Sequence, residues 1–199
     1  MTATATRRGA SRATTRMLVV GAVAVAGTTL LAARPALVGA TPVPVTVLAV
    51  LFVVVLVAGM GMPLPAAAPR PAQAGTGRRT TMLVTLAGVA AFAVGRWLVG
   101  GHPPTTGTAF LVMTSTLAAV AEEAWFRRLW FGLLAPAGDG IAIAGSTLLF
   151  AAVHVSIYGV WVLPLDLAAG LLLGWQRSAS GSWLAPAITH VAANLLVVL

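Results

Sequence analysis

Long apolar segments with very little charge restrict this chain to folds that use lipid as their solvent. Charged residues make up 8% of its 199 residues, whereas a soluble domain usually has about 25%. So little polar surface cannot cover a water-soluble globule of this size. Backbone groups in lipid must find their hydrogen bonds within their own segment. We therefore expect an all-α fold, a polytopic transmembrane helical bundle of about seven spans.

The apolar runs are separated by turns that contain Gly, Pro or Arg, and each run approaches the length of a membrane span. The predicted spans cover roughly residues 17–33, 45–62, 81–99, 108–134, 141–158, 160–175 and 183–199. They divide the chain into a basic cytoplasmic tail without regular structure (1–16), N-terminal transmembrane helices and loops (17–107), and a C-terminal transmembrane core (108–199). The first run could instead be a secretory signal, but the later spans favour a membrane helix.

The basic residues set the expected orientation. The chain has twelve Lys and Arg residues, all of them Arg, and a net charge of +8. They lie at the ends of apolar runs and form no long basic stretch with aromatics, so we expect no nucleic-acid partner. The tail, the loop at 63–80 and the turn at 176–181 carry most of them, which predicts a cytoplasmic N-terminus and an outside C-terminus. The Ala-, Val- and Arg-rich composition favours a multi-pass protein of the bacterial cell (inner) membrane, and the absence of Cys excludes a cysteine nucleophile.

Polar side chains inside the spans gather in the C-terminal half. An ionisable residue within a span costs about 2.5–3.5 kcal/mol on insertion scales. The interiors of the first two predicted spans contain none. The later spans contain Glu122, Glu123, Arg127, Arg128, His154, Asp166, His190 and Asn194. This asymmetry indicates a functional site within the bilayer.

Helical spacing separates the two adjacent glutamates. Glu123 and Arg127 are four residues apart and share a helix face, so we expect a structural ion pair. Glu122 is rotated by about 100° from Glu123. We therefore expect Glu122 to be a free carboxylate that points into a cavity.

Two histidines and an amide complete a set that could hydrolyse a peptide bond. His190 and Asn194 share one helix face, and Phe150 should pack beside His154. The rise of a helix allows Glu122, His154 and His190 to meet at mid-depth. A carboxylate and a neutral His can deprotonate a water, while a second His and an Asn can stabilise an oxyanion.

A metal site is the alternative for the same residues. Glu122, His154 and His190 could together bind a divalent metal such as zinc, which would lower the pKa of a bound water. The common HExxH motif of helical zinc proteases is absent. The sequence therefore does not require a cofactor.

Three motifs resemble a known family. EEAWFRR at 122–128 fits an EExxxR pattern, FAAVH at 150–154 fits FxxxH, and HVAAN at 190–194 fits HxxxN. Together they resemble the CPBP family, the Abi or type II CAAX prenyl endopeptidase-like intramembrane proteases, over roughly residues 108–199. The resemblance implies that Glu122 is the catalytic glutamate and that His154 helps it to activate water. It further implies that His190 and Asn194 form an oxyanion hole, supported by Glu123 and Arg127.

These observations predict an intramembrane endopeptidase that acts on a membrane-associated or secreted peptide in a cavity open to the cytoplasm. Its partners would be that peptide and the lipid bilayer. Two alternatives are a non-catalytic immunity or scaffold protein that binds a peptide in the same cavity, and a small proton-coupled transporter. Asp166 is expected to be a buried structural partner, and His102 an ordinary surface residue. The tryptophans mostly flank span ends, as interface anchors do.

Overall fold

All regular structure in the described part of the chain is helical. The computed structural model describes residues 2–39, 45–64, 77–98 and 109–198, and side chains within the first helix from residue 14 to 36. The helices are α1 (Thr2–Gly39), α2 (Val45–Gly61), α3 (Arg78–Leu98), α4 (Ala109–Glu123), α5 (Phe131–Leu134), α6 (Asp139–Tyr158), α7 (Leu163–Ser180) and α8 (Leu184–Val198). A π-helix, η1 (Ala124–Trp130), joins α4 to α5 in one rod, and short 3-10 turns precede α6 and α7.

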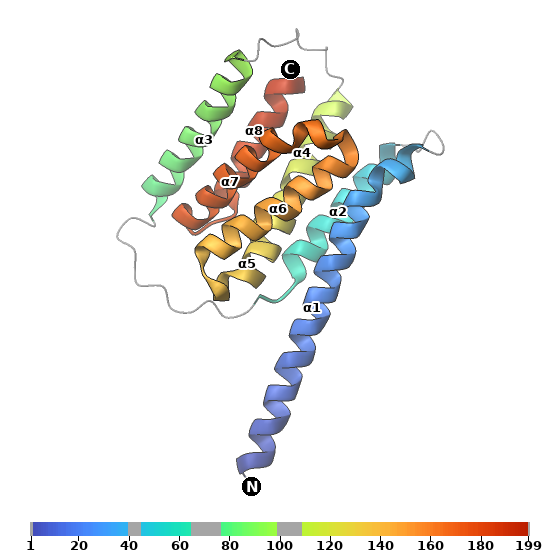
Figure 1. Ribbon diagram of the computed structural model, residues 1–199, viewed down its shortest axis with the longest axis vertical. Helices are drawn as coiled ribbons and strands as arrows, with labels where there is room; N and C mark the ends of the chain where they lie inside the picture. The colour runs from blue at the N-terminus through green and yellow to red at the C-terminus, as the bar shows by residue number, and fades with distance from the viewer. Residues whose placement is uncertain (1, 40–44, 65–76, 99–108, 199) are drawn as a thin grey trace.

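The expected all-α bundle is confirmed. With α4, η1 and α5 counted as one rod, the described residues form seven helical rods (Figure 1). Four segments are long and apolar enough to cross a membrane, namely Thr14–Ala36, Arg78–Leu98, Ala109–Ala137 and Asp139–Tyr158. Two further apolar helices, Thr46–Gly61 and Leu184–Val198, are shorter. The architecture suits a membrane protein.

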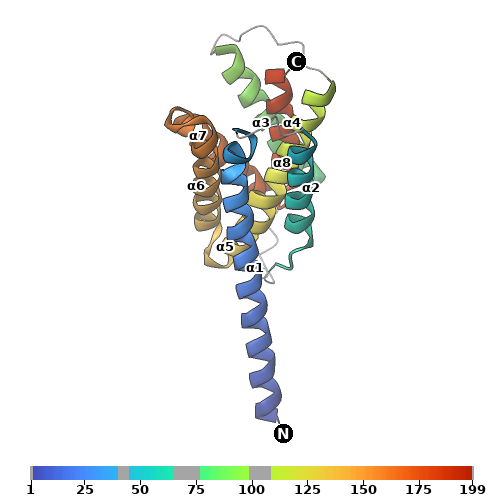
Figure 2. The same ribbon diagram turned by 90° about the vertical axis from the view of Figure 1, so that its right-hand side faces the viewer.

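The prediction of an unstructured tail at 1–16 is wrong. Helix α1 begins at Thr2 and continues without a break into the first apolar run. Ala and Arg are strong helix formers, and no Pro interrupts this segment. The N-terminal part of α1 consequently projects beyond the bundle as a helix (Figures 1 and 2).

The rod made of α4, η1 and α5 forms the centre of the bundle. It contacts α1, α2, α6, α7 and α8. The side chains of Trp125, Phe126 and Leu129 on η1 are almost fully buried. This packing fixes the residues just before η1, which include both adjacent glutamates.

Trp125 is an exception to the expectation that the tryptophans mostly flank span ends as interface anchors. Its side chain is 1% exposed. Its indole N–H donates to Thr28 Oγ1 at 3.0 Å, and the Trp130 indole donates to the same oxygen at 2.8 Å. A Cβ on Gly27 would lie 2.1 Å from the Trp125 ring, so only Gly allows this approach. The indoles therefore fasten α1 to the centre of the bundle.

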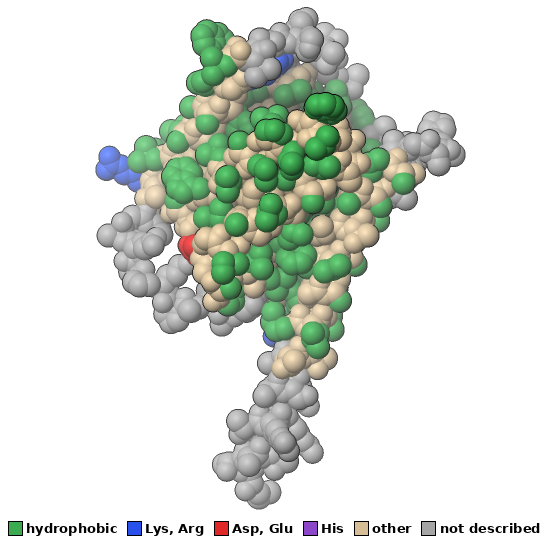
Figure 3. Space-filling model, viewed as in Figure 1, with side chains coloured by type: hydrophobic (Ala, Val, Ile, Leu, Met, Phe, Trp, Pro, Cys, Tyr) green, Lys and Arg blue, Asp and Glu red, His purple; other side chains and the backbone are tan. Residues whose placement is uncertain are grey.

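The outer surface is apolar, as lipid contact requires. Large apolar side chains on several helices are exposed, among them Leu18, Val57, Met113 and Leu148. Figure 3 shows hydrophobic side chains distributed over the bundle in the view of Figure 1. An apolar surface of this extent is unusual for a soluble monomer and is consistent with a lipid environment.

Helices α6 and α7 approach closely through glycines on α7. A Cβ on Gly170 would lie 2.7 Å from Thr147 Cγ2, and one on Gly174 would lie 3.1 Å from Ile143 Cγ2. Small residues four apart are the usual means of close helix packing in membranes. This contact sets the distance between α6 and α7.

The close contact predicts that a Gly→Ala substitution has different effects on stability at two positions. Gly170→Ala should lower the melting temperature of the purified protein in detergent, because the added methyl group meets both the side chain and the backbone of Thr147. Gly95→Ala should leave it unchanged or raise it, because nothing lies within 4 Å of that position and Ala favours helix by up to about 1 kcal/mol. Equal stability of the two variants would contradict the packing described.

Candidate active site

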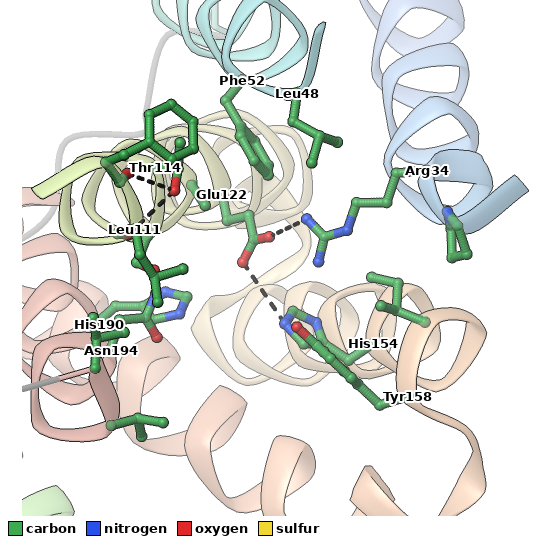
Figure 4. Close-up of a pocket in the computed structure, with 17 residues that line it drawn as sticks. Arg34, Leu48, Phe52, Leu111, Thr114, Glu122, His154, Tyr158, His190 and Asn194 are labelled. Carbon is green, nitrogen blue, oxygen red and sulfur yellow. Dashed lines mark hydrogen bonds and ion pairs between the residues drawn. The ribbon is translucent and has the colours of Figure 1, made fainter. Parts of the chain in front are cut away.

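Glu122 is the buried acid at the end of α4, and it is paired. Its side chain accepts a hydrogen bond from Arg34 Nη1 to Oε1 at 2.8 Å, across 88 positions of sequence. Its second oxygen, Oε2, faces His154 Nε2 at 3.7 Å. Figure 4 shows Glu122 between Arg34 of α1 and His154 of α6. The expectation of a free carboxylate is therefore wrong, although Glu122 does point into a cavity.

Arg34 is the site residue that the sequence analysis missed. The first span is predicted over residues 17–33, which leaves Arg34 just beyond its end. Helix α1 continues to Gly39, and the Arg34 side chain is buried over the ring of Phe52. An ionisable residue beside an apolar run is itself a signal, but only the tertiary structure reveals Glu122 as its partner.

The geometry of His154 indicates which ring nitrogen carries the proton. Nδ1 lies 3.0 Å from the backbone oxygen of Phe150, one helical turn earlier. A carbonyl can only accept, so Nδ1 must donate. In the neutral imidazole this leaves the lone pair on Nε2, the nitrogen that faces Glu122. The expected packing of Phe150 beside His154 is confirmed, with ring centroids 4.2 Å apart.

Glu123 does not line the cavity, and its Oε1 binds two partners. Arg127 Nη1 donates to its Oε1 at 3.2 Å, which confirms the expected pair, and both side chains are fully buried. His190 Nδ1 lies 2.9 Å from the same oxygen. Arg127 Nη2 also donates to the backbone oxygen of Gly170 on α7 at 3.2 Å. Glu123 and Arg127 thereby join α7 and α8 to the central rod.

Asn194 lies one turn after His190, on the same face of α8. Its Nδ2 donates to the backbone oxygen of Ser115 on α4 at 3.1 Å. One of the two amide protons is used in this bond, and the other can reach a ligand. Figure 4 shows His190 and Asn194 side by side, across the cavity from His154.

All four predicted catalytic residues line one cavity of about 750 Å³. They are Glu122, His154, His190 and Asn194. The other polar wall residues come from α1, α4 and α6, and most of the remaining wall is aliphatic or aromatic. The apolar wall residues are Pro35, Leu48, Phe52, Phe110, Leu111, Ala118, Ile157, Val197 and Val198. The cavity thus combines a few convergent polar groups with an apolar wall, as binding sites commonly do.

The cavity lies at the end of the bundle opposite the N-terminus. Its wall uses the end of α1 and the beginning of α2, the first turns of α4, and the ends of α6 and α8. These helix ends gather near the C-terminus, whereas the N-terminus lies at the other end (Figure 1). A cytoplasmic N-terminus and a cavity open to the cytoplasm were both expected. They are incompatible in this structure.

Asp166 is buried on α7, as expected, but it does not bond directly to a site histidine. It lies within electrostatic range of His154 and His190. Its Oδ2 has no hydrogen-bond partner among the described residues. His102 lies outside the described residues.

The alternative ligand set of Glu122, His154 and His190 does not fit a metal ion. Within residues 2–39, 45–64, 77–98 and 109–198, no three His, Asp or Glu side chains are arranged to hold one. Arg34 already places a cation on Glu122. A second cation beside the guanidinium would be repelled. A metalloprotease is therefore not supported.

The buried Glu123–Arg127 pair predicts a non-additive effect on stability. Arg127→Met should lower the free energy of unfolding by about 3–5 kcal/mol, because it leaves a buried carboxylate without its cation. The double variant Arg127→Met/Glu123→Gln should recover part of that loss, because Gln is neutral and can still accept from His190. Both values come from denaturation in detergent. A double variant less stable than Arg127→Met would show that the pair does not act as described.

Comparison with known families agrees with the motifs. Residues 104–196 match the family described as Rce1-like, type II CAAX prenyl endopeptidase Rce1-like. The resemblance to CPBP proteases is thereby confirmed for this half of the chain, and it supports a protease in general terms. Neither the curated proteins nor the solved structures include a significant match to the chain.

Proposed function

We propose that this chain, whose residues 104–196 match Rce1-like endopeptidases, is an intramembrane endopeptidase that uses water activated by Glu122 and His154. Its substrate would be a membrane-associated or secreted peptide. The observation that carries the proposal is the cavity in which Glu122, His154, His190 and Asn194 converge. The proposal assigns a role to each of these side chains.

Glu122 and His154 are positioned to share one water. Their facing atoms, Oε2 and Nε2, are 3.7 Å apart, which is too long for a direct hydrogen bond. A water bonded to both would be oriented by two acceptors, and such bridging is common at this separation. Glu122 would take one proton as the water oxygen attacks the peptide carbonyl carbon. It would return that proton to the leaving amine when the C–N bond breaks.

His190 and Asn194 would stabilise the oxyanion that forms on the carbonyl oxygen. Because the Glu123 carboxylate can only accept, His190 Nδ1 must donate to it. With a proton on Nε2 as well, His190 would donate to the oxyanion from that nitrogen. The second amide proton of Asn194 would be the other donor. Two preorganised donors of this kind are the usual arrangement in an oxyanion hole.

Arg34 would act as a positioning residue for the base. It holds Oε1 of Glu122 at 2.8 Å and so leaves Oε2 directed at His154. It also supplies the charge that allows a carboxylate to remain buried. Without it, Glu122 would bind a proton and could no longer accept one from water.

Substitution of the base tests the enzymatic proposal. Glu122→Gln keeps the size of the side chain but cannot take a proton, so cleavage should fall about 100-fold or more. The measurement is a quantitative comparison of peptides in cells that express the wild type or the variant, in which an unprocessed precursor should accumulate. The matched control is Asp139→Asn, an acid-to-amide change at the other end of the bundle, which should keep wild-type processing. A folded Glu122→Gln variant that processes normally would show that Glu122 is not the base of the reaction.

Substitution of Arg34 tests its positioning role. Arg34→Met should reduce cleavage by about 10–100-fold, the equivalent of one charged hydrogen bond. Arg34→Lys should restore part of the activity, because it retains a cation for Glu122. Cleavage rates are compared at matched amounts of folded protein. Equal activity of the Met and Lys variants would show that the charge of Arg34 has no role.

A further inference from the structure

The wall of the cavity is built almost entirely from one end of the bundle. It includes Arg34 in the last turns of α1, Leu48 in the first turn of α2 and Phe110 in the first turn of α4. Tyr158 is the last residue of α6, and Val198 is the last of α8. These ends meet opposite the N-terminus (Figure 1). Whichever side of the membrane this end faces is the side from which a substrate can enter.

The arginines are concentrated at the other end. Arg78 and Arg79 begin α3, and Arg177 lies in the last turn of α7. Arg16 lies within α1, and Arg128 lies within η1. Arg128 donates to the Gly59 oxygen at the end of α2, which places it there as well. In the sequence, Arg7, Arg8 and Arg12 precede Arg16, and Arg70 lies between α2 and α3. Segments rich in Arg close to span ends stay in the cytoplasm.

Among the described residues, two arginines lie at the cavity end, and each is bound within the protein. Arg34 is paired with Glu122, and Arg96 Nε donates to the backbone oxygen of Leu196 at 3.2 Å. The turn between α6 and α7 at this end instead exposes apolar side chains, with Trp161 87% exposed and Val160 60% exposed. Trp at a span end is typical of a membrane interface. The two ends therefore differ clearly in charge.

We infer that the cavity opens on the extracytoplasmic side of the membrane and that the substrate is a peptide segment that has already crossed it. The substrate half of this inference rests on the proposed protease function. Leu48, Phe52 and Leu111 line the cavity near Glu122, so the residues that flank the cleaved bond are apolar (Figure 4). Secreted peptides and the outer ends of membrane segments meet both requirements. Cytoplasmic peptides do not reach the site.

Single cysteines test the orientation directly, because the chain contains none of its own. Val160→Cys marks the cavity end, and Ala137→Cys marks the arginine-rich end. Both positions are exposed, so a reagent in solution can reach them. Neither residue lines the cavity. In right-side-out membrane vesicles, a membrane-impermeant maleimide should label Val160→Cys, and it should label Ala137→Cys only after detergent is added. The reverse pattern, or equal labelling of both, would overturn the inference.

A second measurement tests the substrate and separates the two proposals. Precursors that accumulate with Glu122→Gln should have their cleavage positions in extracytoplasmic segments, between apolar residues. Cleavage positions in cytoplasmic segments would overturn the inference even if proteolysis is real. If the cysteines are labelled as predicted but no precursor accumulates, the inferred orientation is upheld. The protease function is then contradicted, and with it the inferred substrate.

Discussion

The ion pair between Arg34 and Glu122 is the interaction on which the rest of the site depends. It connects α1 to the central rod at 2.8 Å, and it balances a carboxylate that would otherwise be costly to bury in a membrane protein. It also fixes the side chain so that one oxygen binds Arg34 and the other faces His154. The indoles of Trp125 and Trp130 bind Thr28 and so hold α1, the helix that carries Arg34, against the central rod. Packing far from the cavity thus contributes to the geometry of the base.

Two neighbouring glutamates have separate tasks because a helix turns by about 100° per residue. Glu122 faces the cavity, while Glu123 faces Arg127 and His190 and is fully buried. The π-helix begins immediately after this pair, and such segments often occur at functional sites. Glu123 thereby orients a histidine that Glu122 does not contact. The structural acid and the proposed base have different hydrogen-bond partners, although they are adjacent in sequence.

Sequence reasoning succeeded where contacts are local to one helix. The Glu123–Arg127 pair, the shared face of His190 and Asn194, and the stacking of Phe150 on His154 all follow from a four-residue spacing. The partner of Glu122 could not be predicted in this way, because Arg34 lies 88 positions away on a helix expected to end before it. The position of the cavity relative to the N-terminus could not be predicted either. It depends on which helix ends form the wall, and only the assembled bundle reveals them.

The central claim is that Glu122 is held by Arg34 beside His154, and solid-state NMR in lipid bilayers tests it most directly. The measurement is the dipolar coupling between the ¹⁵N-labelled guanidinium of Arg34 and the ¹³C-labelled carboxyl carbon of Glu122, with Arg34→Met and Glu122→Gln used for assignment. A strong coupling that disappears in both variants is the predicted result. A spectrum in which the only Arg–Glu coupling is that of Arg127 with Glu123 would contradict the account.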